Sequence, residues 1–136
     1  MIKSDAQRER TEAQIAGFRR ALAKVTQEKL GRRSAAIRGS YEGMVTQLED
    51  ELREYDELKA GGLKLPPIEK LDKIAPFVTK IRIAKGISQT ELARRLGVSK
   101  QVISRYEESD YQTVGIGRLQ EILDAIGISA LVTLSA

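Results

Sequence analysis

The chain of 136 residues has no cysteine, no histidine and no tryptophan, and only 4% of its residues are aromatic. Without cysteine there is no disulfide, thiolate ligand or thiolate nucleophile. Without histidine, the commonest general base and metal ligand is missing too. The remaining Ser, Lys, Asp and Glu side chains form no glycine-rich phosphate loop and no carboxylate group at ligand spacing. We therefore expect no catalytic residue, no metal and no cofactor, and a protein that is not an enzyme.

Long hydrophobic runs are also missing. No stretch of about 18 apolar residues is present to span a membrane, and residues 1–5 show no secretory signal pattern. The simplest expectation is a cytoplasmic protein with no membrane partner.

Basic residues gather in one part of the chain. Between Lys80 and Arg105, seven basic side chains stand against the single acid Glu91, a local balance of +6 within an overall net charge of +4. A charge run on helices is usually a solvated surface, but a basic cluster also attracts a nucleic-acid backbone. Charge alone leaves both interpretations open.

The stretch from Ser88 to Glu107 predicts two short helices joined by a tight turn. Ser88 is a suitable N-cap with Glu91 three positions on. An apolar inner face follows at helical spacing: Leu92, Ala93 and Leu96. Gly97 then ends the first helix, because glycine suits a turn with positive φ or a close helix approach.

The second helix of this stretch separates its residue types cleanly. Val98 is expected to fill the corner before it, and Ser99 is expected to cap it. The inner face consists of Val102, Ile103 and Tyr106. The opposite face carries only hydrogen-bond donors and acceptors: Lys100, Gln101, Ser104 and Arg105. A protein interface would place aromatic or aliphatic anchors there, so this face favours a polar partner.

At these residues the chain resembles the Cro/repressor-type (XRE) helix-turn-helix family, whose motif has an alanine and a glycine four residues apart. The residues at the family's packing positions are Leu92, Ala93, Leu96, Gly97, Val98, Ile103 and Tyr106. The segment from about Ala75 to Ile128 follows the family's five-helix order. The resemblance implies sequence-specific binding of double-stranded DNA as a two-fold dimer on a palindromic operator, with the second helix of the motif in the major groove.

The resemblance also implies individual roles. Base reading is expected from Lys100, Gln101, Ser104 and Arg105. Phosphate contacts are expected from Gln89, Thr90, Ser99, Tyr111, Gln112 and Thr113. Tyr111 could equally anchor the polar loop of residues 108–115 by packing on the domain, and the sequence does not choose between these two roles.

The N-terminal part predicts a long helical hairpin of coiled-coil type. Its first helix is expected from Ser4, with Gln7 three residues on, to about Leu30, and its apolar stripe is Ile15, Phe18, Leu22 and Val25. The second helix is expected to open at Ser34, with the stripe Ile37, Tyr41, Met44, Leu48, Tyr55 and Leu58. Neither helix can bury its stripe alone, so each must pack on the other, on a second protomer or on another protein.

Two features of the hairpin have more than one interpretation. Gly17, Gly39 and Gly43 lie inside the helices, where each costs about 1 kcal/mol relative to alanine or marks a close helix approach. Acidic residues crowd the second half of the second helix and basic residues crowd the bend, so ion pairs inside the hairpin are expected to be weak. The surface is either an ordinary solvated one or a patch for DNA or a protein partner.

A linker with Gly61-Gly62 and Pro66-Pro67 predicts two domains, residues 1–62 and residues 63–136. In the second domain we expect a helical turn around residues 68–73 and a helix that begins at Pro76. A last helix is expected from Ile116 to a cap at Gly127.

The final segment, Ile128 to Leu134, contains β-branched and apolar residues that predict a short strand. A lone strand is unstable. Pairing with the same strand of a second subunit would form a homodimer, and the alternative is a loosely packed or frayed tail.

Together these observations predict an all-α DNA-binding repressor with an N-terminal hairpin and a C-terminal strand. The resemblance further suggests an autoregulating antitoxin or a phage-type regulator, and a toxin would then be a protein partner of the hairpin. The alternative is a protein-interaction module in which the hairpin binds a partner and the helix-turn-helix is only structural.

Overall fold

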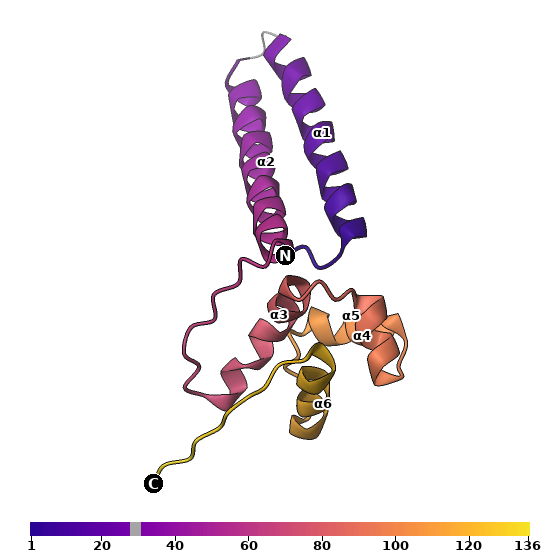
Figure 1. Cartoon of the computed structure of the whole chain (residues 1–136). Coiled ribbons are helices and arrows are strands. Elements are labelled where there is room, and N and C mark those ends of the chain that lie inside the picture. Colours follow the sequence, from indigo (N-terminus) through magenta and orange to yellow (C-terminus); the bar gives the residue numbers. More distant parts are fainter. Residues whose placement is uncertain (28–30) are drawn as a thin grey trace. The chain divides into compact units, whose positions relative to one another are not determined.

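The computed structural model describes residues 1–27 and 31–136, and every regular element within them is helical (Figure 1), which confirms the all-α prediction. The elements are α1 (Asp5–Gln27), α2 (Arg32–Lys59), η1 (Leu71–Lys73), η2 (Ala75–Phe77), α3 (Val78–Ala84), α4 (Gln89–Leu96), α5 (Lys100–Glu108) and α6 (Ile116–Ile126). The chain divides into two compact units, Met1–Glu57 and Leu58–Ala136. The domain boundary between residues 62 and 63 stays a prediction.

The N-terminus of α1 has the predicted cap. The Ser4 Oγ accepts a hydrogen bond from the backbone N–H of Gln7 at 3.3 Å. In return the side-chain oxygen of Gln7 accepts one from the backbone N–H of Lys3 at 2.8 Å. These bonds satisfy N–H groups that have no partner within the helix. The expected end of this helix at Leu30 lies outside the described residues.

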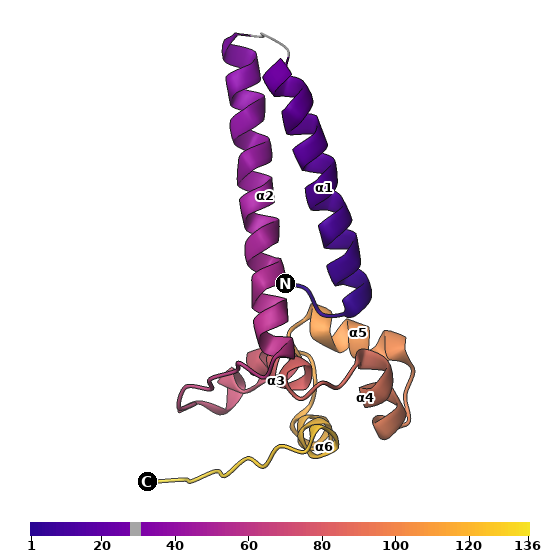
Figure 2. The same cartoon turned by 45° about the horizontal axis from the view of Figure 1, so that its top comes forward.

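Helices α1 and α2 pack against each other within the chain, which answers one question that the sequence left open. Figures 1 and 2 both show the two helices side by side. Ile15 of α1 and Val45 of α2 are buried. The rings of Phe18 and Tyr41 lie with their centroids 5.6 Å apart. The apolar stripe of each helix therefore has the other helix as a partner.

Two expectations for α2 were wrong. The helix begins at Arg32 and not with a cap at Ser34, because the Gly31 carbonyl accepts the N–H of Ser34 at 3.1 Å. The Ser34 hydroxyl is buried and makes no hydrogen bond. Ile37 and Met44 do not join the buried stripe but are 41% and 44% exposed, because α2 is rotated so that Val45 faces inward beside Tyr41.

Ion pairs between α1 and α2 are more prominent than we expected. The Arg8 guanidinium donates from Nε to Asp56 Oδ1 at 2.7 Å and from Nη2 to Asp56 Oδ2 at 3.0 Å. Arg19 pairs with Glu49 further along the hairpin. Hydrogen bonding to Arg8 lowers the pKa of the Asp56 carboxyl. Both pairs are largely exposed, so they contribute little to stability.

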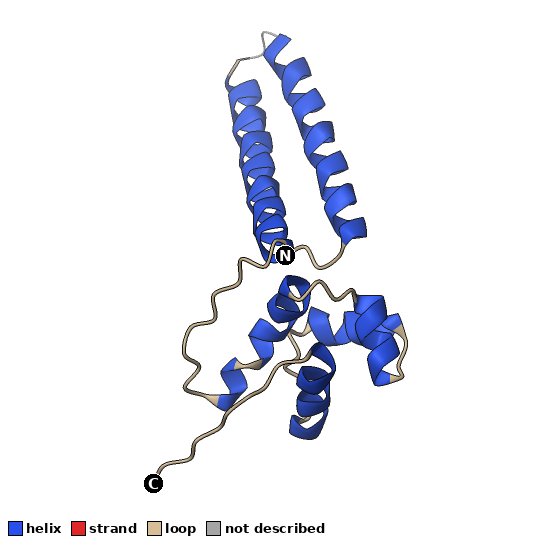
Figure 3. Cartoon of the chain, in the orientation of Figure 1, coloured by secondary structure: helices blue, strands red, loops and turns tan. Residues whose placement is uncertain are grey.

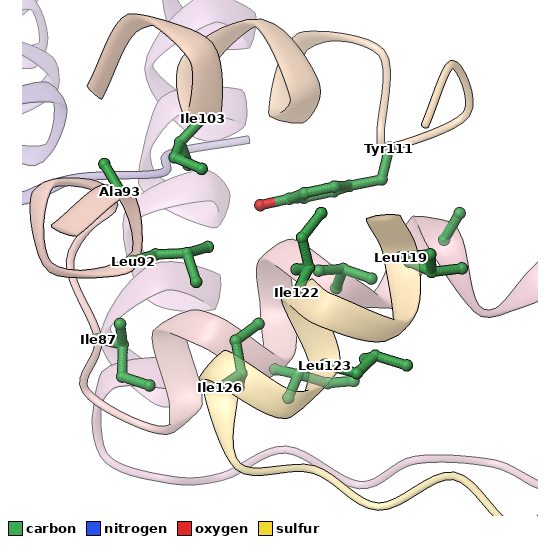
Figure 4. Close-up of a cluster of buried hydrophobic side chains, with 12 residues drawn as sticks. Ile87, Leu92, Ala93, Ile103, Tyr111, Leu119, Ile122, Leu123 and Ile126 are labelled. Atoms are coloured by element: carbon green, nitrogen blue, oxygen red, sulfur yellow. The ribbon is translucent and has the colours of Figure 1, made fainter. Parts of the chain in front are cut away.

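The core of the second unit is formed by α3, α4, α5 and α6, and Figure 4 shows its buried side chains. Pro76 lies in the first turn of η2, which leads into α3, so the predicted helix does begin there. The 3-10 turn η1 lies before the segment from Ala75 to Ile128, within which the structure has η2 and the four helices α3 to α6. The last, α6, ends as predicted at Gly127, whose φ of 82° is in the left-handed region.

The predicted C-terminal strand is absent from the structure. After Gly127 the described chain has no regular structure (Figure 3). Leu131 and Leu134 are 97% and 93% exposed. A strand needs the backbone groups of a neighbouring edge, and the single chain offers none to this tail. Within the described residues no helix is long and apolar enough to cross a membrane.

Candidate nucleic-acid interface

Helix α4 is bounded by the two residues that the sequence predicted. The Ser88 Oγ accepts a hydrogen bond from the backbone N–H of Glu91 at 3.0 Å, so Ser88 is the N-cap. Gly97 ends the helix with φ 67° and ψ 31°. A side chain is strained in that conformation, whereas glycine is not. The N–H of Val98 then bonds to the carbonyl of Ala93 at 3.0 Å, which fixes the direction of the chain into α5.

The start of α5 differs from the prediction in one detail. Ser99 occupies the N-cap position with an extended backbone, but its hydroxyl makes no capping hydrogen bond. The Ser99 carbonyl instead accepts the N–H of Val102 at 3.1 Å. Because Ser99 is exposed, its hydroxyl can be offered to an outside acceptor such as a phosphate oxygen.

The predicted packing residues of the motif come together between α4, α5 and α6. Leu92, Ala93 and Ile103 are buried in the core. Leu96, Val98 and Tyr106 are partly buried and packed against the same core. Figure 4 shows Ala93 of α4 beside Ile103 of α5, with Leu92 next to them. The small Ala93 side chain allows the two helices of the motif to approach each other.

The four predicted base readers all lie on one face of α5. Lys100, Gln101 and Arg105 are exposed, and Ser104 is half-buried. Their spacing along a helix brings the four side chains together on the side away from Ile103. This face has the donor and acceptor groups that read base edges. The base-reading role itself stays a prediction.

The six predicted phosphate-contacting residues divide into two groups. Those on the surface are Thr90, Ser99, Gln112 and Thr113. Gln89 and Tyr111, by contrast, are buried. The amide nitrogen of Gln89 donates to Glu107 Oε1 at 2.7 Å, so it is already engaged inside the domain. A phosphate contact by Gln89 stays a prediction.

The structure favours the loop-anchor role for Tyr111. The residue is only 1% exposed, and its hydroxyl donates to Glu107 Oε2 at 3.3 Å. Figure 4 shows its hydroxyl directed into the core. Tyr111 and Asp110 both have positive φ, 57° and 50°, a strained conformation for residues with side chains. In this conformation Tyr111 cannot contact a phosphate, because its hydroxyl does not reach the surface.

Arg82, Gln89 and Tyr111 all donate hydrogen bonds to the carboxylate of Glu107, a residue that was not among the predicted site residues. Its side chain is 0% exposed and that of Arg82 is 2% exposed. Arg82 donates to both carboxylate oxygens, from Nε at 3.0 Å and from Nη2 at 2.7 Å. A signal was present in the sequence: Glu107 follows Ile103 by four residues, which places it on the buried face of α5.

Burial of this cluster affects the Tyr111 hydroxyl. Desolvation raises the pKa of Tyr111 well above its usual value, and the negative charge of Glu107 raises it further. The Arg82 guanidinium also donates from Nη1 to the carbonyl of Ile87 at 2.7 Å. Arg82, Glu107, Gln89 and Tyr111 are called the Glu107 cluster below. It holds α5 against α3 and α4 from the inside.

The net positive charge exposed around α4 and α5 is smaller than the net charge counted from the sequence between Lys80 and Arg105. Because Arg82 is neutralised inside the domain, the exposed balance between Lys80 and Arg105 falls from +6 to +5. Arg94 and Arg95 both donate hydrogen bonds to Glu91. These bonds lower the pKa of Glu91 to about 2, and the bond from Arg94 has the largest effect. The remaining balance is still strongly positive.

The fold and the polar face of α5 define a DNA-binding domain. Residues 78–132 match the family model described as Helix-turn-helix. A search of curated proteins and a search of solved structures found no match. Residues 78–132 thus form a helix-turn-helix domain of the Cro/repressor type, as the resemblance implied, and domains of this type bind DNA.

Proposed function

We propose that the protein is a sequence-specific repressor that binds double-stranded DNA as a dimer on a palindromic operator. The observation that carries this proposal is the face of α5, where Lys100, Gln101 and Arg105 are exposed together on a helix anchored by the Glu107 cluster. An exposed helix face of this kind fits the major groove. Repression follows from occupancy of the operator, and no cofactor is needed.

The bidentate side chains of α5 supply the sequence preference. The Gln101 amide can bond to an adenine edge, and the Arg105 guanidinium can bond to a guanine edge. Thr90 near the start of α4 and Ser99 before α5 are exposed. Their hydroxyls, with the unpaired N–H groups of the helix N-termini, suit phosphate oxygens on either side of the groove.

Dimerisation is assigned to the tail of residues 128–134. A two-fold dimer must hold its recognition helices about 34 Å apart, one turn of DNA, so a contact on the DNA-binding unit itself is the most direct solution. The tail has exposed apolar side chains at Leu131 and Leu134 and no partner strand in the chain. The tail itself forms one side of a groove, and Leu65, Ile68 and Leu71 are among the residues that line the rest of it. The tail of a second copy would bind along this groove, beside the tail of the first.

A more specific biological role for the proposed repressor is that of an autoregulating antitoxin. It stays a prediction from the resemblance, with the hairpin as the toxin-binding part. The test is genetic and biochemical: whether the neighbouring reading frame encodes a small basic protein that copurifies with this one. The rival interaction module is disfavoured because the α5 face has no aromatic or aliphatic anchor.

The sequence-specific function is tested with the Gln101→Ala variant. The operator is first selected from random duplexes with the wild-type protein. The variant should then lose about 1–3 kcal/mol of binding free energy on the operator and little on random duplexes. Thr90→Ala is the matched control, because a phosphate contact should weaken binding to both DNAs alike. Equal losses for Gln101→Ala on both DNAs would refute base reading by α5.

A further inference from the structure

One flank of α2 is exposed along its first half and half-exposed at its acidic end, where the N-terminal ammonium of Met1 pairs with Glu51 at 3.5 Å. The members of this flank follow one another at steps of three or four residues and are exposed or half-exposed: Arg33, Ile37, Ser40, Met44, Gln47, Glu51 and Glu54. We call this surface the α2 face. Ile37 and Met44, 41% and 44% exposed, give it an apolar centre. These two side chains leave apolar area on one stripe of the helix that a second helix can cover.

Charge is distributed very unevenly along the hairpin. Residues 16–45 carry seven basic and two acidic side chains, a balance of +5. Residues 1–15 and 46–57 together carry four basic and nine acidic side chains, a balance of −5. The α2 face repeats this polarity, with Arg33 at one end and Glu51 and Glu54 at the other. The charges at the two ends of this surface, Arg33 and Glu54, are complementary when it is turned around.

We propose that the α2 face binds the α2 face of a second copy of this chain, with the two helices antiparallel. Arg33 lies eleven residues before Met44, and Glu54 lies ten residues after it. A two-fold axis near Met44 therefore brings Arg33 of each copy beside Glu54 of the other. It also brings the two Met44 side chains together, and it places Ile37 of each copy opposite Glu51 of the other. The contact is isologous, as expected for a two-fold dimer.

Two glycines in α2 support a close approach on this side. Among the described residues, and apart from the adjacent backbone of α2 itself, no atom lies within 4 Å of a Cβ added to Gly39 or Gly43. Packing inside the chain therefore does not require either glycine, although each weakens the helix. Gly43 borders the α2 face one residue before Met44, and Gly39 lies one turn away on the same side. A second helix can come near the backbone at these positions.

Charge decides between this occupant and DNA. A DNA backbone would be attracted to the basic half of the hairpin but repelled by the acidic half. A second hairpin in antiparallel orientation satisfies both halves at once. The contact is independent of the tail contact proposed above, and a chain with both contacts can join two operator-bound dimers.

A charge exchange tests the proposal on the full-length protein. The double substitution Leu131→Pro and Val132→Pro blocks the tail contact, so that sedimentation equilibrium reports association through the hairpin alone. In this background the protein should still form dimers. Arg33→Glu and Glu54→Arg should each raise the dimer dissociation constant about tenfold, because like charges then meet at two symmetric places. The variant with both substitutions should restore association to within about threefold of the background.

A second test separates the interface from helix stability. Gly43→Leu should raise the helix content and the Tm, because leucine has a higher helix propensity than glycine and a Cβ at this position has open space around it. The same variant should weaken dimerisation about tenfold or more, because the side chain would enter the contact. Ala35→Leu, at an exposed position outside the α2 face, is the control and should leave the dissociation constant unchanged.

The outcomes that overturn the proposal are distinct. A tail-blocked protein that stays monomeric at about 100 μM would refute it, because the hairpin contact would then be too weak to hold two copies together. Charge exchanges that leave the dissociation constant unchanged would also refute it. If Arg33→Glu lowers affinity for DNA without changing association, the basic half binds phosphate and not a second hairpin.

Discussion

Arg82 and Glu107 are 25 residues apart in the chain, and their charged groups meet 2.7 Å apart inside the DNA-binding unit. The contact is bidentate, with a second bond at 3.0 Å. It joins α3 to α5, and Gln89 at the start of α4 bonds to the same carboxylate. The orientation of the recognition helix therefore depends on a buried ion pair that does not itself face the proposed DNA surface.

We predict that Glu107→Gln destabilises the protein by about 3–5 kcal/mol, because it leaves the buried Arg82 guanidinium without its counter-charge. Urea unfolding followed by circular dichroism measures this loss. The double variant Arg82→Met with Glu107→Leu should be less destabilised than Glu107→Gln, since an apolar pair leaves no buried charge. A loss below about 1 kcal/mol for Glu107→Gln, typical of exposed ion pairs, would show that water reaches the cluster.

The second prediction concerns Tyr111 at alkaline pH. Burial raises the pKa of Tyr111 in the folded state, whereas an unfolded tyrosine ionises near pH 10. Above pH 10 the unfolded state therefore binds fewer protons than the folded one, and the free energy of unfolding falls as pH rises. Urea unfolding at pH 7, 9 and 10.5 should show this fall.

The control for this prediction removes the ionisable group. Tyr111→Phe should cost about 0.5–1.5 kcal/mol at pH 7 through the lost hydrogen bond and should flatten the fall above pH 10. Tyr41→Phe, at a half-buried ring in the hairpin, should leave the fall in place. If Tyr111→Phe and the wild type lose stability equally above pH 10, Tyr111 ionises normally in the folded protein.

The third prediction is that operator binding depends strongly on salt. The exposed balance of +5 between Lys80 and Arg105 is present in each subunit. Each phosphate that is neutralised adds about 0.9 to the slope of log affinity against log salt concentration. Titrations of an operator duplex between 50 and 200 mM salt, concentrations over which such slopes are measured, give the slope. A value near zero would argue that DNA is not the ligand.

The fourth prediction concerns the tail. Leu131→Pro with Val132→Pro removes two adjacent backbone N–H groups, which point to opposite sides of a strand, so at least one would face the partner. Because both side chains are exposed, the fold of the chain should be unaffected. Operator affinity should fall about 100-fold, which corresponds to about 2.7 kcal/mol. The reason is that the two recognition helices are no longer held at the required spacing.

Threonine at the same two positions is the matched control for the proline variant. Leu131→Thr with Val132→Thr keeps both N–H groups and a high strand propensity, so pairing of the backbones remains available. This variant should retain most of the operator affinity. An unchanged affinity for the proline variant would show that the tail is not the contact that aligns the recognition helices.

The local features of the helix-turn-helix were predictable because they depend on near neighbours in the sequence. The cap at Ser88 and the left-handed Gly97 follow from residue type and spacing. The same holds for the cap at Gly127. The polar face of α5 needed only the period of 3.6 residues. These features are local, so one sequence is sufficient to place them.

The errors arose where the outcome depended on distant residues. Ile37 and Met44 fit a three-four stripe as well as Val45 does, and only the rotation of α2 against α1 selects Val45. Tyr111 had two plausible roles, and its bond to Glu107 selects the interior one. The tail residues have strand propensity but find no edge to pair with in the chain.

The sequence by itself determined the helical class, the position of the recognition helix and its polar side chains, since these depend on periodicity and capping. Tertiary structure decided which polar residues turn inward. Arg82, Gln89 and Glu107 are spread over 26 residues of sequence, and no local pattern states that they share one buried site. Their mutual hydrogen bonds offset the free-energy cost of desolvation only when the three helices are packed together. The cluster therefore forms only in the folded domain, and no single segment contains it.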